Sequence, residues 1–209
     1  MQPNLLLYSH HTDNELIRKI KGGNAAPYEV LIRRHIRTMY RIARACGATN
    51  YEAEHKICET LVNGYDAIPE FDLRNSFRIY AASMIAAAMQ AVPKHQALHE
   101  AVFASDTDPE EEAGTGIAES ALSTSTEATL DTLPQSYRLA YILCEEEGFS
   151  VPDAAAILGK DPVQVGERLE RARREVKANG FLMAGTVEVY PCPMNRIDKI
   201  TGDVMTAII

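Results

Sequence analysis

The 209-residue sequence predicts an all-α protein made of two small helical domains, an acidic linker and a short C-terminal extension. Apolar residues in the first half recur at helical spacing, without sustained alternation of period two. Helix-starting and helix-stopping residues divide the second half into short helices. The predicted boundaries are 13–94 for the first domain, 95–126 for the linker, 127–180 for the second domain and 181–209 for the extension.

Four helices are expected in the first domain. Asp13 and Asn50 are suitable N-caps, the Gly22-Gly23 pair ends the first helix, and Pro93 stops the last one. The second helix carries arginines on its outer face. The helices are expected from Asp13 to the glycine pair, from Ala25 to Cys46, from Tyr51 to about Ile68, and from about Asn75 to Val92.

The second domain has the sequence form of a helix-turn-helix. A helix through 127–133 and another between Pro134 and Gly148 come first. Ser150 then caps a short helix that Gly159 ends, and Asp161 caps a longer, basic-ended helix that Pro162 opens. Four apolar residues of the last helix are spaced 4, 3 and 4 apart and predict its buried stripe: Val165, Leu169, Ala172 and Val176.

The opposite face of this last helix is the candidate DNA-binding surface. Arginine can reach guanine edges or phosphates, and glutamine can pair with adenine. The candidates are Gln164, Arg168, Arg171, Arg173 and Arg174. An ordinary solvated face is the alternative, with the arginines paired to Glu167, Glu170 and Glu175 of the same helix.

The net charge of −8 argues at first sight against a nucleic-acid partner, because basic residues drive phosphate binding. The stretch from Gln96 to Asp131, however, holds nine acids and no Lys or Arg. Its central S-D-T-D-P-E-E-E-A-G-T-G lacks large apolar residues and predicts a flexible linker. The rest of the chain therefore carries +1, and nucleic acid is not excluded.

Several other classes of protein are not supported. No apolar run is long enough to insert into a membrane, and Met1 to Leu7 lacks the pattern of a secretory signal. The four cysteines form no close C-x-x-C pair, which favours reduced thiols in the cytoplasm. No metal-ligand spacing, nucleophile elbow or glycine-rich phosphate loop occurs, so neither an enzyme nor a cofactor is predicted.

Residues 133–176, L-P-Q-S-Y-R-L-A-Y-I-L-C-E-E-E-G-F-S-V-P-D-A-A-A-I-L-G-K-D-P-V-Q-V-G-E-R-L-E-R-A-R-R-E-V, resemble the fourth region of the extracytoplasmic-function sigma factors of bacterial RNA polymerase. The first half is similar to their second region, in D-N-E-L-I-R-K-I-K-G-G, A-E-H-K-I-C-E-T-L and F-D-L-R-N-S-F-R-I-Y. The resemblance covers about residues 13–180.

The resemblance implies core RNA polymerase and promoter DNA as partners, and an anti-sigma protein as regulator. The first unit would bind polymerase and open the minus-ten element, and the second would read the minus-thirty-five element. Within A-E-H-K-I-C-E, Glu54 and Glu59 would be polar contacts to polymerase, and Ile57 and Leu61 apolar ones. A core position is the alternative for the apolar pair.

The chain also departs from the family pattern. His55 and Cys58 stand where the pattern has Asp and Gln. Ser83, Ala87 and the segment 88–92 stand where polar and basic residues would grip single-stranded DNA. A sigma-like interaction module that binds an anti-sigma factor or polymerase without melting DNA is therefore the alternative function.

The extension is expected to begin with a short strand, G-T-V-E-V-Y-P-C-P, and to end with D-V-M-T-A-I-I as a second strand or a helix. It would pack on the second unit, pair with a partner or cover the DNA-binding face. The regulatory hypothesis is that it controls access to the helix-turn-helix. A docked extension that covers apolar surface is the simpler alternative.

Overall fold

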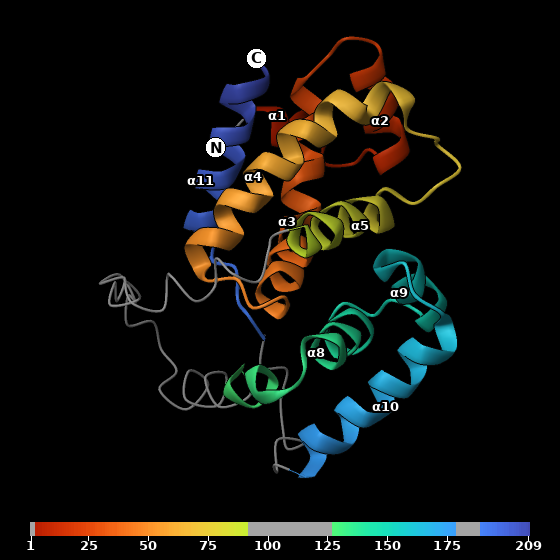
Figure 1. Cartoon of the computed structure of the whole chain (residues 1–209). Coiled ribbons are helices and arrows are strands. Elements are labelled where there is room, and N and C mark those ends of the chain that lie inside the picture. The colour runs from red at the N-terminus through yellow and green to blue at the C-terminus, as the bar shows by residue number, and fades with distance from the viewer. Residues whose placement is uncertain (1–2, 92–126, 179–188) are drawn as a thin grey trace.

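A computed structural model describes residues 3–91, 127–178 and 189–209 of the chain, and these residues form an all-helical protein of two units (Figure 1). The prediction of an all-α fold is therefore confirmed. The predicted linker, 95–126, lies outside the described residues, as do residues 181–188 of the predicted extension, which include the first half of its expected strand, 185–188.

The first unit is a bundle in which α3 lies at the centre and packs against α2, α4 and α5. Tyr28 and Tyr40 are both fully buried parts of α3, and the Tyr28 hydroxyl donates a 2.6 Å hydrogen bond to the Leu61 carbonyl oxygen. The elements are α1 (Pro3–Tyr8), α2 (Asp13–Lys21), α3 (Ala26–Ala45), α4 (Asn50–Ala67), a 3₁₀ turn (Ile68–Glu70) and α5 (Phe77–Gln90).

Two of the predicted N-caps are displaced by one residue. Thr12 and Thr49, rather than Asp13 and Asn50, cap α2 and α4. Each threonine hydroxyl accepts the backbone N–H of a glutamate three residues on, whose carboxylate accepts the threonine N–H in return. The displaced Asp13 accepts hydrogen bonds from Arg34 and His35 of α3 instead, and so ties α2 to the centre of the bundle.

The second unit contains the predicted helix-turn-helix. Residues 127–132 are helical, and α8 (Gln135–Tyr141) continues into a π turn (Ile142–Glu146) before α9 (Val151–Leu158) and α10 (Pro162–Ala178). The Ser150 hydroxyl caps α9, Gly159 ends it with a left-handed φ of 60°, and the Asp161 carboxylate accepts the N–H of Val163 at 2.8 Å. All three residues have their predicted roles.

The C-terminal extension differs from the sequence prediction in two respects. Its described part consists of 189–193, which is neither helix nor strand, followed by α11 (Met194–Ile208). This helix packs on α4 and α3 of the first unit and not on the helix-turn-helix (Figure 1). The alternatives of a terminal helix and of a docked extension are therefore the correct ones.

The two units are packed together along α5 and α9, with further contacts from α3 to α8. Arg138 of α8 is buried and donates a 2.7 Å hydrogen bond to the Ala45 carbonyl oxygen at the end of α3. A cation is favoured there because the last carbonyls of a helix are unpaired and carry partial negative charge. Arg138 also pairs with Asp131 at 2.7 Å, so one side chain connects both units.

Candidate promoter and polymerase interfaces

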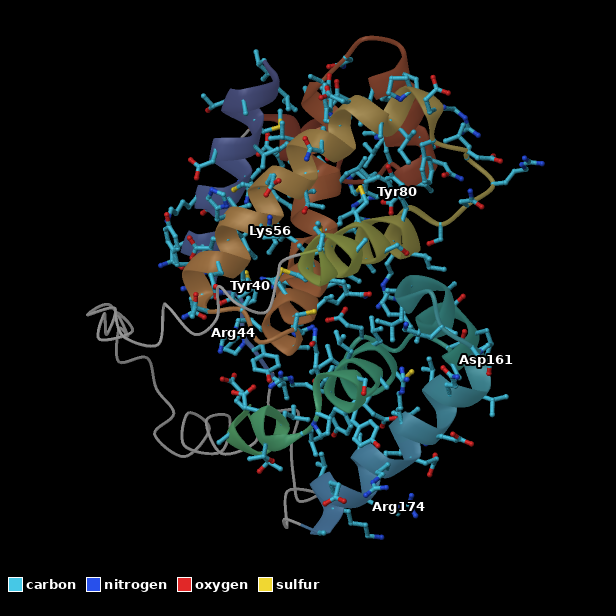
Figure 2. All side chains as sticks on the ribbon, in the orientation of Figure 1. Tyr40, Arg44, Lys56, Tyr80, Asp161 and Arg174 are labelled. Carbon is cyan, nitrogen blue, oxygen red and sulfur yellow. The ribbon has the colours of Figure 1, made fainter. Side chains whose placement is uncertain are left out.

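The outer face of α10 is the candidate DNA-binding surface. The four residues predicted to form its inner stripe, from Val165 to Val176, are all buried against the rest of the second unit. Gln164, Arg171 and Arg174 are exposed on the other side. Figure 2 shows Arg174 near the end of α10, on the side of the second unit that faces away from the first bundle. A helix exposed in this way can enter a major groove.

The predicted arginines of α10 are not equivalent. Arg173 is held by two carboxylates, Glu145 of the π turn and Glu170 of α10, each at 2.5 Å. Arg168 is half-buried, and the Arg171 guanidinium lies 5.9 Å from the centre of the Tyr137 ring. The ion-paired alternative therefore describes Arg173, whereas Arg171 and Arg174 are exposed to a ligand.

The predicted polymerase contacts divide into surface and core residues. Glu59 is exposed and pairs with Lys56 at 2.7 Å, but Ile57 and Leu61 are 0% and 1% exposed. The apolar pair therefore occupies the core position that the sequence left open, and in this conformation it is not available to a partner. Only 14% of the Glu54 side chain is exposed, because α11 lies over it.

The helix that corresponds to the promoter-melting segment, α5, has little basic character on its described surface. Its only Lys or Arg is Arg78, whose guanidinium stacks on the Phe149 ring of the second unit at 4.1 Å. Tyr80 is half-buried in an aromatic cluster with Phe71 and Phe77, at ring distances of 5.0 and 5.9 Å. The segment that would grip single-stranded DNA is therefore partly covered by the second unit.

Glu147 is the main polar residue between the two units, and it was not singled out from the sequence. Its carboxylate accepts hydrogen bonds from the Thr38 hydroxyl and from Arg41, both at 2.5 Å, and its backbone carbonyl accepts one from Arg78. Only 5% of the side chain is exposed. No local pattern distinguishes it from Glu145 and Glu146, because its partners lie more than 60 residues away along the chain.

The described residues contain no group of three or more His, Cys, Asp or Glu side chains that could hold a metal ion. None of the described helices is both long and apolar enough to cross a bilayer. Burial raises the pKa of the Cys46 and Cys58 thiols to about 11 each, which leaves little reactive thiolate at neutral pH.

Comparison with known protein families supports the same division into two units. Residues 31–92 match the family model of sigma-70 region 2, and residues 124–176 match that of sigma-70 region 4. Together the two matches cover more than half of the chain. The first contains α4 and α5, and the second contains the whole helix-turn-helix. The two family matches, together with the fold, therefore define a sigma-70-type protein.

Individual relatives show to which group of sigma-70-type proteins the chain belongs. The sequence is 26% identical over 169 residues to the ECF RNA polymerase sigma factor SigE of Mycolicibacterium smegmatis, a match over 75% of this chain and 63% of SigE. The chain belongs to the extracytoplasmic-function (ECF) sigma factors, which are not enzymes.

Two solved structures have a similar fold. CnrH, in complex with the cytosolic domain of CnrY, aligns with a TM-score of 0.57 and 23% identity over 79% of this chain and 95% of CnrH. The sigma factor RpoE of Bartonella quintana, in complex with the anti-sigma factor NepR, aligns with a TM-score of 0.54 and 18% identity over 74% and 95%.

Proposed function

We propose that this protein is an alternative sigma factor that binds core RNA polymerase, directs it to a small set of promoters and is controlled by an anti-sigma protein. The observation that carries the proposal is the outer face of α10, where Gln164, Arg171 and Arg174 are exposed on a correctly capped helix-turn-helix within the region 4 match. Such a protein acts in the bacterial cytoplasm, where polymerase and promoters are found.

Four arginines and one glutamine of α10 have distinct proposed roles. Arg171 and Arg174 would contact phosphates or guanine edges, and Gln164 at the start of the helix would contact a base. Arg168 would add a contact at the flank. Arg173 would contribute less, because its guanidinium already binds two carboxylates.

Regulation by an anti-sigma protein is supported by the packing of the two units on each other. The solved neighbours with a similar fold are sigma factors in complexes with CnrY and with the anti-sigma factor NepR. In this chain α9 covers part of α5 and Glu147 connects the units. We propose that an anti-sigma partner binds this closed arrangement and that polymerase requires an open one.

A second function is favoured by the composition of α5. A helix with Arg78 as its single base, and with that base stacked on Phe149, offers little to single-stranded DNA. The chain would then bind polymerase or an anti-sigma factor without melting promoter DNA. This second candidate keeps the partners of the first but not the initiation step.

Run-off transcription with core polymerase and a promoter library tests the first function directly. A transcript that depends on this protein is the expected result, together with permanganate-reactive thymines at the minus-ten element. Polymerase binding without reactive thymines would instead establish the second function. Absence of binding both to core polymerase and to sigma regulators would reject both.

A further inference from the structure

The C-terminal helix α11 lies along α4, the helix that carries the proposed contacts to polymerase (Figure 1). One side of α11 is apolar and buried, and the other is exposed. The buried residues are Ile197, Ile200, Thr201 and Val204, whose spacing of 3, 1 and 3 places them on one helical face. The contact is therefore that of an amphipathic helix in a groove.

Two ion pairs with Glu54 fix the register of α11 on α4. Arg196 and Lys199 of α11 bind opposite oxygens of the Glu54 carboxylate, with Arg196 Nε at 2.6 Å and Lys199 Nζ at 2.9 Å. Arg196 also donates to the Tyr40 hydroxyl at 2.5 Å. Figure 2 labels Tyr40 and Lys56, which lie on the two helices that α11 contacts. Glu54 is thus fully engaged by the protein's own tail.

The family resemblance implies that Glu54 and Glu59 of α4 contact polymerase, and α11 binds the first and lies beside the second. The two occupants, α11 and polymerase, therefore cannot be present together on this face of α4. We infer that this face is an exchangeable helix-binding surface, occupied by α11 in the free protein and by a helix of core polymerase during initiation. The charge of Glu54 defines the external occupant as a helix with two basic side chains about one turn apart. This inference rests on the proposed function and adds to it that α11 competes with polymerase for α4.

The structure also shows what would keep α11 close to α4 after it dissociates. Tyr190, just before α11, donates its backbone N–H to Glu127 at 2.9 Å and its hydroxyl to Asp131 at 2.7 Å. The segment before α11 is therefore held by the second unit, and also by Arg41 of α3, which donates a 3.1 Å hydrogen bond to the Val189 carbonyl oxygen, independently of the contact that α11 makes with α4. Such a tether keeps a released helix at high local concentration, and rebinding is then an intramolecular step.

A pair of full-length double variants tests the exchange. Arg196→Gln with Lys199→Gln removes both partners of Glu54 and lowers the net charge by two. Asn195→Glu with Thr206→Glu makes the same change in net charge at exposed positions of α11. We expect the first variant to bind core polymerase about tenfold more tightly than wild type. The reason is that α11 covers the binding surface in a smaller fraction of the molecules. The second should bind as wild type does.

Cys58 provides a measure of α11 docking that does not involve polymerase. It lies on α4 in a groove with Asp203 and Val204 of α11, and burial raises the pKa of its thiol. Release of α11 should expose the thiol, lower its pKa and speed its alkylation by iodoacetamide. Mass-spectrometric mapping separates Cys58 from the other three cysteines. We expect alkylation to rise only in the variant without Arg196 and Lys199.

The two measurements separate failure of the inference from failure of the proposed function. Faster alkylation of Cys58 with unchanged polymerase affinity would overturn the exchange and leave the sigma function intact. Faster alkylation with no polymerase binding by any form would reject the proposed function itself. If the glutamine variant keeps α11 docked, Val204→Asp takes its place, because it puts a carboxylate into the apolar contact between α11 and α4. Cys58 alkylation and polymerase affinity of this variant are then compared with those of wild type in the same way.

Discussion

The helices that are proposed to bind partners differ between the two units in how they are covered. In the second unit, α10 buries one stripe and leaves Arg171 and Arg174 exposed. In the first unit, α4 is covered by α11 and α5 is partly covered by α9. The helix proposed to read DNA is thus exposed in the free protein, while the helices proposed for polymerase binding and promoter melting are covered.

Under the proposed function, this difference places the control of the protein in the first unit. A sigma factor that exposed all of its surfaces would bind polymerase without a signal. Under the proposed function two separate contacts have to be released, Glu54 from α11 and Glu147 from α3 and α5. Each contact is carried by a carboxylate of low exposure, so each can be tested by changing one side chain.

The largest effect is expected from Glu147→Ala at the contact between the units. The change removes the acceptor of Thr38 and Arg41, and breaking a buried ion pair costs about 3–5 kcal/mol. The packing of the two units should weaken by that amount, and the closed form should open. Small-angle scattering would detect the opening as an increased radius of gyration, and denaturant titration would detect an earlier first transition.

Glu167→Ala is the matched control, because Glu167 is exposed on α10 and also loses one carboxylate. Its scattering curve and first transition should equal those of the wild type. An unchanged radius of gyration in Glu147→Ala would mean that apolar contacts between α5 and α9 hold the units together on their own.

The local part of this architecture was predictable from the sequence. The helix-turn-helix caps, the buried stripe of α10 and the four main helices of the first domain all follow from short-range patterns of apolar, capping and breaking residues. Caps at Thr12 and Thr49 were placed one residue late, since Asp13 and Asn50 are also good capping residues. The short helix α1 carries no comparable signal and was not predicted.

The contacts between distant segments were not predictable in the same way. Nothing near Glu147 indicates that Thr38 and Arg41 will bind it, and nothing near Arg196 indicates Glu54. The extension was expected to pack on the second unit, to pair with a partner, to cover the DNA-binding face or to dock on apolar surface. Its helix α11 is found docked on the first unit, because its apolar face is specified by its own residues but the surface that it covers is not. The DNA-binding role of the α10 residues and the polymerase role of the α4 residues stay predictions.

The next effect concerns the open face of α10 and compares two arginines. Arg174→Ala should reduce the slope of log affinity for promoter DNA against log salt by about one, because one phosphate contact is lost. Arg173→Ala should change the slope much less, since Glu145 and Glu170 already neutralise this guanidinium at 2.5 Å. Fluorescence anisotropy with holoenzyme at several salt concentrations measures both slopes.

Equal slopes for these two variants would show that Arg173 leaves its carboxylates when DNA binds. Lys160→Ala serves as the control, because it removes an exposed positive charge in the turn before α10 rather than on its outer face. If its effect matched that of Arg174→Ala, the binding would depend on net charge and not on the face of the helix.

The smallest effects should come from two glycines of the helix-turn-helix, with opposite signs. Gly159 has a φ of 60° and open space around an added Cβ, so Gly159→Ala should cost about 1–2 kcal/mol through its backbone conformation alone. Gly166 lies inside α10 with ordinary room for a Cβ, 3.9 Å from Val151, so Gly166→Ala should stabilise by about 0.5–1 kcal/mol. Hydrogen exchange should show both changes in α9 and α10.

Because α11 docks on the other unit, alkylation of Cys58 should not respond to either glycine variant. A response there would mean that the open and covered regions are coupled, and that a signal received by the DNA-reading helix can reach the polymerase-binding one.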